Sequence, residues 1–281
     1  MRLLEEAEEA YLWEPGAGRR LASLDSSVKA RALVGAAAVI AVDIGLWVTE
    51  RGPQLLKPLE HISAFMLLSR RLGLSYKATL DDLEEMVLDL ASRAESDGGV
   101  RLWAAGSPGR EAAVAVYLLR ALEPSVSQLL DSGVEAYTAG VSEASASDLL
   151  APSYSRVCRL ICMEGAIYSS MGAVFLLEGS RVISPPSLVA HEPVRSVVAE
   201  LARYEGLKVV ERCVTCGELY SADEVFLACS VLGIVPVRAV DGAEIGVGEA
   251  ARGLQVGFLK AARGLTVFPP SWVVLARRRR L

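Results

Sequence analysis

Apolar residues repeat at helical spacing in the first half of the chain. Pro58 can begin one helix and Gly73 can end it, because proline suits the first helical position and glycine suits the end. Thr79 can cap the next helix, since Asp82 stands three residues further on in the manner of a capping box. The pattern therefore predicts two consecutive helices.

Short apolar runs bounded by turn residues predict strands in the same half. Two such runs cover 100–105 and 112–119 and are joined by the Gly- and Pro-containing segment 106–109. The apolar run 32–42 is too short to span a bilayer, so it predicts a buried strand or helix segment. Segment 122–125 is the best candidate for a linker between domains.

The second half alternates more quickly between the two kinds of element. We predict strands at 134–139, 157–162, 172–177, 181–184, 207–212, 224–229 and 234–240, and helices at 193–204, 217–222 and 249–263. Strands and helices are mixed on both sides of the linker. The sequence thus predicts an α/β (α+β) protein with two domains, residues 1–122 and 129–281.

The charge pattern excludes some partners. The 281 residues carry a formal net charge of −5, so no basic field covers the surface to attract nucleic acid. The tail Arg277–Arg280 is interpreted as a solvated end. Acidic residues Glu5, Glu6 and Glu9 fill the first turns where a secretory signal would be apolar, so we predict a cytoplasmic protein without a membrane segment.

Cysteine and histidine spacing does not favour a metal site. Cys213 and Cys216 form one CxxC, but no second such pair accompanies it, and His61 and His191 are the only histidines. We therefore expect no metal ligands and five ordinary thiols. A redox role for Cys213 and Cys216 stays open, because Cys216 stands near a predicted helix start.

One run of residues is more specific. Segment 206–212 leads into Glu218–Phe226 (ELYSADEVF), followed by Pro236-Val237-Arg238 and Asp241-Gly242. This run resembles the class IV aminotransferases, which include branched-chain aminotransferases, D-amino-acid aminotransferases and aminodeoxychorismate lyases. The resemblance implies a two-domain, fold-type-IV architecture: a small N-terminal α/β domain, a larger pseudo-barrel C-terminal domain, and usually a dimer with the active site between domains.

Enzymes of that family hold pyridoxal phosphate through a lysine Schiff base and an acid beside the pyridine nitrogen. The resemblance places the lysine between strands 134–139 and 157–162, but no lysine occurs from Ala121 to Cys162. It places the acid at Tyr168 or Ser169, whose neutral hydroxyls cannot balance a pyridinium charge.

The phosphate-binding positions implied by the resemblance also differ. An arginine position holds Ala64, and the helix that would face the phosphate begins with Glu192 and Pro193. Pro193 removes one N–H donor, and we expect the Glu192 carboxylate to cap this helix in place of a phosphate. A last turn keeps the Ser230 hydroxyl but has apolar residues at 231–232.

These differences predict a non-catalytic member of the family with no bound cofactor and no catalytic residues. It would act as a binding or partner subunit, in a homodimer or a heterodimer with a related chain. One alternative is an active pyridoxal-phosphate-dependent aminotransferase or lyase with a rearranged site, whose lysine is Lys57 or Lys29. We expect no lysine nitrogen at the base of the cleft between the domains.

A second alternative is a binder of a small anion or metabolite that uses the old cleft. The residues that could remain from a ligand site are Arg101, Tyr168, Ser169, Arg195 and Ser230. Structural hydrogen bonds are the more common role for such residues, because buried polar groups are usually paired for stability alone. The sequence names no substrate.

Overall fold

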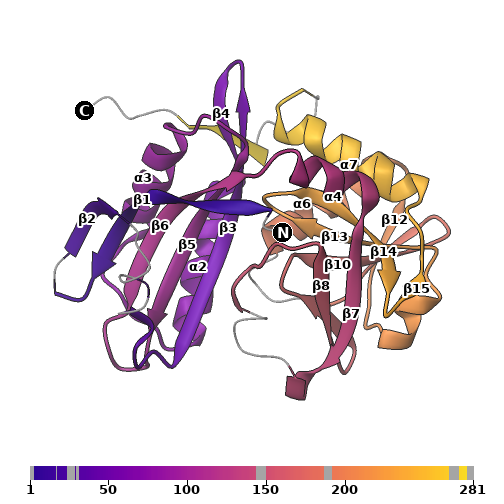
Figure 1. Ribbon diagram of the computed structural model, residues 1–281, viewed down its shortest axis with the longest axis horizontal. Coiled ribbons are helices and arrows are strands. Elements are labelled where there is room, and N and C mark those ends of the chain that lie inside the picture. The colour runs from indigo at the N-terminus through magenta and orange to yellow at the C-terminus, as the bar shows by residue number, and fades with distance from the viewer. Residues whose placement is uncertain are drawn as a thin grey trace.

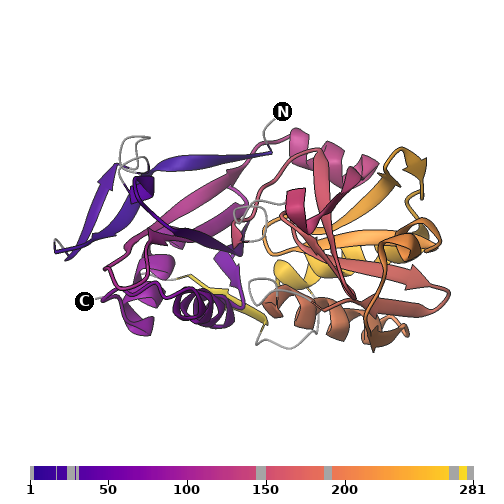
Figure 2. The ribbon, with the colours of Figure 1, turned by 90° about the horizontal axis from the view of Figure 1, so that it is seen from below.

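The computed structural model describes residues 3–16, 18–23, 29, 32–143, 150–186, 192–265 and 272–276. Two β-sheets lie side by side, one built mainly from the first half of the chain and one from the second (Figure 1). The orange and purple helices lie along the same side of both sheets in Figure 2. The predicted mixed α/β architecture is confirmed.

The first sheet is antiparallel, in the order β16-β4-β3-β5-β6-β1-β2 among the described residues. Its strands are β1 (Leu4–Glu14), β2 (Gly18–Ser23), β3 (Ala38–Thr49), β4 (Gly52–Leu56), β5 (Gly98–Gly106), β6 (Ala113–Ala121) and β16 (Val273–Leu275). Helices α2 (Pro58–Arg71) and α3 (Leu80–Ala91) cover one face and share an apolar core with it. The predicted capping box at Thr79 is confirmed, since Thr79 and Asp82 bond each other's backbone N–H.

The second sheet mixes parallel and antiparallel pairs, in the order β12-β11-β10-β13-β14-β7-β8-β9, with β15 on β14. Its strands are β7 (Val134–Gly140), β8 (Val157–Met163), β9 (Ala166–Ser169), β10 (Ala173–Glu178), β11 (Arg181–Ser184), β12 (Lys208–Glu211), β13 (Glu224–Cys229), β14 (Gly233–Val240) and β15 (Ala243–Glu244). Among the described residues, the helices with full bounds in this half are α4 (Ser125–Ser132), α6 (Glu192–Tyr204) and α7 (Glu249–Ala262), with 3-10 turns η1 (Val141–Glu143) and η3 (Cys216–Tyr220). Helices α6 and α7 share an apolar core with β10, β11, β13 and β14.

The end of the described chain returns to the first sheet. Strand β16 pairs antiparallel with β4, matching Val273 with Leu56 and Leu275 with Gln54. The buried Trp272 just before it accepts a hydrogen bond from the Lys57 backbone N–H at its carbonyl. The predicted bounds 1–122 and 129–281 assign this strand to the second half, whereas its backbone hydrogen bonds place it on the sheet of the first.

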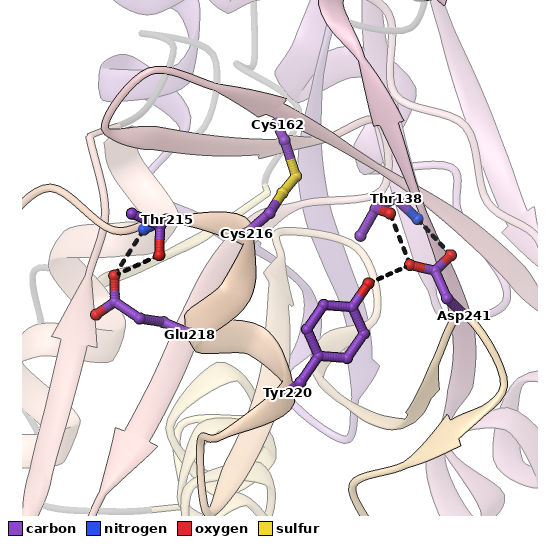
Figure 3. Close-up of a disulfide and its surroundings, with 7 residues drawn as sticks. All are labelled: Thr138, Cys162, Thr215, Cys216, Glu218, Tyr220 and Asp241. Carbon is purple, nitrogen blue, oxygen red and sulfur yellow. Dashed lines mark hydrogen bonds between the residues drawn. A yellow bond between two sulfur atoms is a disulfide. The ribbon is translucent and has the colours of Figure 1, made fainter.

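A disulfide joins two parts of the second half. Cys162, at the end of β8, is bonded to Cys216 at the start of η3, with their Cα atoms 6.0 Å apart (Figure 3). The expectation of five ordinary thiols is thus wrong for these two residues, because the fold places together cysteines that lie 54 residues apart. Cys213 is exposed and unpaired with another cysteine, so Cys213 and Cys216 do not form the redox pair that their spacing left open.

Two further contacts hold η3 in place beside the disulfide. The Glu218 carboxylate accepts a hydrogen bond from the Thr215 backbone N–H (2.7 Å), which forms a capping box at the start of the turn. At its other end, the Tyr220 hydroxyl donates to Asp241 (2.6 Å), and the same carboxylate accepts the Thr138 hydroxyl (Figure 3).

Among the described residues, no helix is long and apolar enough to cross a membrane. The same residues contain no cluster of three His, Cys, Asp or Glu side chains that could hold a metal ion. The basic tail Arg277–Arg280 lies outside the described residues.

Candidate functional site

A buried ion pair marks the boundary between the two halves. Asp43 on β3 and Arg101 on β5 stand opposite each other in the first sheet, and two guanidinium–carboxylate hydrogen bonds of 2.7 Å join them. The Asp43 side chain is only 2% exposed. Burial alone would lower the pKa of Arg101, but the Asp43 carboxylate raises it well above its ordinary value, so Arg101 stays charged.

The second half supplies two more partners to this pair. The Tyr154 hydroxyl donates to Asp43 (2.7 Å), and Arg101 donates to the Pro152 carbonyl (2.7 Å). Burial, reinforced by the nearby carboxylate, raises the pKa of Tyr154 well above its ordinary value, so this residue stays a neutral donor. The pair is therefore satisfied from both halves of the chain.

Lys29 lies at the edge of the same cluster. Its amine pairs with Glu6 and stands 4.5 Å from the centre of the Tyr117 ring. The Tyr117 hydroxyl donates to Glu6 (3.0 Å). Burial raises the pKa of Glu6, but the Lys29 amine and the Tyr117 hydroxyl more than offset it, so the pKa lies below its ordinary value. This cluster of Glu6, Lys29, Asp43, Arg101, Tyr117 and Tyr154 is called the interdomain cluster below.

A histidine and a serine form a second contact between the halves. The His61 side chain on α2 is fully buried, and its Nε2 lies 2.6 Å from the Ser230 hydroxyl oxygen on the β13–β14 turn. His61 Nδ1 lies 2.8 Å from the Lys57 carbonyl oxygen. Ser230 is 8% exposed. The β13–β14 turn, residues 229–233, is thus fastened to the first turn of α2.

Two glycines let this turn approach the first sheet closely. A Cβ on Gly45 of β3 would lie 1.8 Å from the Ser230 carbonyl oxygen, and one on Gly99 of β5 would lie 2.7 Å from Val231. Val231 and Leu232 are buried in the core that spans both halves. The apolar residues of this turn therefore pack against the first sheet.

Replacing Gly45 by alanine should lower the free energy of unfolding by about 1–3 kcal/mol, because the new methyl group forces the β13–β14 turn away from β3. Chemical denaturation measures the change. Gly253→Ala on α7 is the matched control, since a Cβ there meets nothing within 4 Å and alanine favours a helix. Equal effects of the two substitutions would contradict the close approach.

The start of α6 lies beside the first turn of α2. The Lys57 amine lies 3.1 Å from the Ser196 hydroxyl and 4.0 Å from the Glu200 carboxylate, both on α6. The buried Arg195 donates to the Ser184 hydroxyl (2.6 Å) and lies 5.5 Å from the centre of the Phe175 ring. Lys57 and Arg195 thus place two positive charges near this helix start.

The structure distributes the predicted ligand residues unevenly. Arg101 and Ser230 lie at the boundary between the halves, in the interdomain cluster and on the β13–β14 turn. Ser169 is buried on β9, where its oxygen lies 2.9 Å from the Cys158 sulfur and accepts the Met171 N–H. Tyr168 is half-buried on β9 opposite Ile161.

Arg195 is committed to Ser184 and Pro185 at the end of β11, which is a structural role for this predicted ligand residue. Ala64 is buried in α2, as are Pro193 and Val194 in α6. The predicted capping by Glu192 lies outside the described residues, because the side chain of this residue is not described. The sequence analysis missed five residues of the site: Glu6, Asp43, Tyr117, Tyr154 and, as a partner of Ser230, His61.

The five lysines fall into two groups. Lys77, Lys208 and Lys260 are exposed. Lys29 and Lys57 are mostly buried, with side chains 22% and 12% exposed, and each is paired with a carboxylate. Lys29 reaches the edge of the interdomain cluster, and the expectation that no lysine nitrogen lies at the base of the cleft stays a prediction.

Comparison with known proteins matches one segment of the second half to a family. Residues 166–240 match the profile of the family described as amino-transferase class IV. This part of the chain is thus similar to the class IV aminotransferases. It is 36% identical over 86 residues to a putative branched-chain-amino-acid aminotransferase of Methanocaldococcus jannaschii, an alignment that covers 29% of this chain and 30% of the relative. The branched-chain-amino-acid aminotransferase of Pseudomonas aeruginosa is 33% identical over 88 residues, or 31% of this chain and 29% of the relative.

Solved structures of this family extend the likeness to the whole fold. A branched-chain amino acid aminotransferase of Escherichia coli superposes with a TM-score of 0.76 at 19% identity, covering 95% of this chain and 99% of that one. A second branched-chain amino acid aminotransferase, complexed with N-(5'-phosphopyridoxyl)-L-glutamate, gives 0.74 at 18% identity, covering 96% and 99%. At such identities the likeness shows the fold, and the predicted fold-type-IV architecture is confirmed.

The expectation that no cofactor is bound is wrong. Structures of this second aminotransferase contain N-(5'-phosphopyridoxyl)-L-glutamate or pyridoxamine 5'-phosphate, which are pyridoxal phosphate derivatives. These relatives point to pyridoxal phosphate as the ligand of the family. The expectation was based on single sequence positions that differ from the family pattern. Such differences do not show whether other residues of the same cleft can bind the cofactor.

The described residues suit the phosphate group of pyridoxal phosphate better than its aldehyde, which a lysine would have to attack. Ser230 offers a hydroxyl, and Lys57 and Arg195 place positive charge beside the start of α6, which is the chemistry that phosphate groups need. The two mostly buried lysine amines are both paired with carboxylates. Either amine would have to leave its carboxylate partner before it could attack an aldehyde.

Proposed function

We propose that this class IV aminotransferase-like protein binds pyridoxal 5'-phosphate, or a close phosphorylated relative, in the cleft between its halves without a covalent bond. The Ser230 hydroxyl carries the proposal, because it lies on a turn that packs against β3 and bonds to His61 in the first turn of α2. When bound, pyridoxal phosphate supplies an electron sink for reactions of amino acids. The protein would use it as a bound ligand of a non-catalytic subunit.

Charge balance supports phosphate at this place. The Lys57 amine and the Arg195 guanidinium flank the first turns of α6, and the N-terminus of a helix favours a negative charge. The Glu200 carboxylate that faces Lys57 is 4.0 Å away and its side chain is 43% exposed, so it offsets the Lys57 charge only in part. Lys57 and Arg195 thus bring two positive charges to the part of α6 where a phosphate would bind.

A second candidate is a pyridoxal-phosphate-dependent aminotransferase or lyase with a rearranged site. The placement of Lys29 favours it, because this amine lies over the Tyr117 ring at the edge of the interdomain cluster. The Glu6 carboxylate must leave the amine before Lys29 can act as a nucleophile. This requirement is why we prefer binding without a covalent bond.

Borohydride trapping distinguishes the two candidates. The protein is incubated with pyridoxal 5'-phosphate, treated with borohydride or left untreated, and analysed by intact mass and peptide mapping. We expect reversible binding, seen as quenching of tryptophan fluorescence, and no adduct on any lysine. A stoichiometric adduct on Lys29 or Lys57 would establish the second candidate instead, and no quenching at millimolar ligand would refute both.

Ser230→Ala should weaken binding by about tenfold, because one hydrogen bond to a charged group is lost. Ser221→Ala, on the exposed end of η3, is the matched control and should leave binding unchanged. An equal loss in both variants would show that the ligand binds away from the β13–β14 turn.

Two further expectations stay predictions: that the chain forms a dimer, with itself or with a related subunit, and that it is cytoplasmic. Light scattering measures whether the dimer forms.

A further inference from the structure

We infer that a cavity at one end of the first sheet binds a small apolar zwitterion of dipeptide size, through Glu111 and Arg110. The cavity has a volume of about 430 Å³ and lies where β1 and β5 end and β6 begins. Sites for small molecules typically have volumes of about 300–1,000 Å³. The inference goes beyond the proposed function and does not depend on it.

The cavity is separate from the cleft between the halves. Gly99 on β5 faces Val231 of the β13–β14 turn, whereas Gly106 at the end of the same strand lines the cavity. At about 3.3 Å per residue, the two glycines lie about 23 Å apart along the strand. A ligand in the cavity therefore binds without contact to the β13–β14 turn.

Hydrogen bonds fix one wall of the cavity. The Ser107 hydroxyl donates to the Gly35 carbonyl (2.8 Å) and accepts the Ala37 N–H (3.1 Å), which also donates to the Gly106 carbonyl (2.9 Å). These bonds hold segment 35–37 against the β5–β6 turn. Much of the lining is apolar and comes from Pro15, Ala32, Val34, Ala36, Ala105 and Ala113. Such a lining suits a ligand with an apolar body.

Glu111 on this wall has a carboxylate oxygen without a donor. Its Oε1 is buried and, in the part of the chain that the structure describes, has no hydrogen-bond partner. Its Oε2 lies 3.9 Å from the Lys77 amine, but the Lys77 side chain is 70% exposed, so this contact is weak. A buried acceptor without a partner costs free energy. Because the last torsion of a glutamate side chain is broad, a small rotation turns Oε1 toward the cavity, where an ammonium can donate to it.

Arg110 supplies the opposite charge. It is exposed and lines the cavity, and among the described residues its guanidinium has no hydrogen-bond or ion-pair partner. A guanidinium in this state can bind a carboxylate through two N–H groups. The third charged residue of the lining, Glu14, is already bonded to Arg20 (2.6 Å). The wall thus offers one cationic and one anionic group, which together match a zwitterion.

The volume of the cavity indicates the size of this zwitterion. A cavity of about 150 Å³ holds one benzene ring, and this one is nearly three times as large. It therefore has room for two small amino-acid residues. Alanyl-phenylalanine combines a free ammonium, an apolar body and a free carboxylate, so it is a suitable probe.

Calorimetric titration of the wild-type protein with this dipeptide and two capped forms tests the inference. N-acetylation removes the ammonium that Glu111 would bind, and amidation removes the carboxylate that Arg110 would bind. We expect the free dipeptide to bind and each capped form to bind about tenfold more weakly, since each has lost a charge-assisted hydrogen bond. Equal binding of all three, or no binding of the free dipeptide at millimolar concentration, would overturn the inference.

Crossed substitutions assign each charge to its residue. In Glu111→Gln the free dipeptide should bind about tenfold more weakly, and N-acetylation should then cost no further affinity; Arg110→Gln should do the same for amidation. Glu50→Gln and Arg51→Gln are matched controls, because these consecutive exposed residues lie on the β3–β4 turn, outside the lining of the cavity. Controls that weaken binding as much as the cavity variants would refute the assignment. So would displacement of the dipeptide by pyridoxal 5'-phosphate, because it would place the dipeptide in the cleft between the halves.

Discussion

Replacing Cys162 and Cys216 together by alanine should lower the free energy of unfolding by about 4 kcal/mol. The disulfide closes a loop of 54 residues, and the chain entropy that such a closure removes from the unfolded state corresponds to roughly this value. The same bond holds the start of η3 against the end of β8, where Glu218 and Tyr220 make their contacts (Figure 3). Denaturant unfolding of oxidised protein measures the effect.

Two comparisons isolate the contribution of the bond. Treating the wild-type protein with a reductant should reproduce most of the loss, and the double variant should then respond to reductant no further. Cys213→Ala, which removes an exposed thiol three residues from Cys216, should change stability by less than about 0.5 kcal/mol. Equal stability of the oxidised and reduced wild type would contradict the loop-closure argument.

Asp43→Ala should lower the free energy of unfolding by about 3–5 kcal/mol. It leaves the Arg101 guanidinium buried at the boundary between the halves without its carboxylate, and it takes away the acceptor of the Tyr154 hydroxyl. Thermal and denaturant unfolding at neutral pH measure this loss.

A surface pair provides the control for Asp43. Glu85→Ala removes the partner of Arg19, and both side chains of that pair are at least one-third exposed, so we expect a change of less than about 1 kcal/mol. Replacing Asp43 by leucine and Arg101 by methionine together should recover much of the stability lost in Asp43→Ala, because no charge is then left unpaired. If the double replacement cost more than the single one, the pair would be a source of net stability.

Elements defined by local signals could be predicted from the sequence. The helices that begin at Pro58 and after Thr79 carry their start signals within a few residues, and the structure places them within one or two residues of the predicted bounds. Strand β1 could not be predicted in this way. Its acidic residues match the pattern of a solvated turn, and it becomes a strand because β6 and β2 pair with its two edges.

The same holds for the site: some of its residues could be identified from the sequence, but their partners, which lie far away along the chain, could not. Resemblance to a family placed Ser230 and Arg101 near a ligand cleft, and both do lie at the boundary between the halves. Their partners His61 and Asp43 are 169 and 58 residues away along the chain. No spacing rule links such pairs: the pairing of β3 with β5 brings Asp43 to Arg101, and the packing of α2 against the β13–β14 turn brings His61 to Ser230.

Strand β16 has a consequence for how the protein is made. As the chain leaves the ribosome, β4 emerges early and presents an edge that β16 covers only after the strands of the second sheet have been synthesised. Until then the N-terminal sheet has an unpaired strand available to other nascent chains. The protein therefore depends on its last described strand to cover this edge of its first sheet.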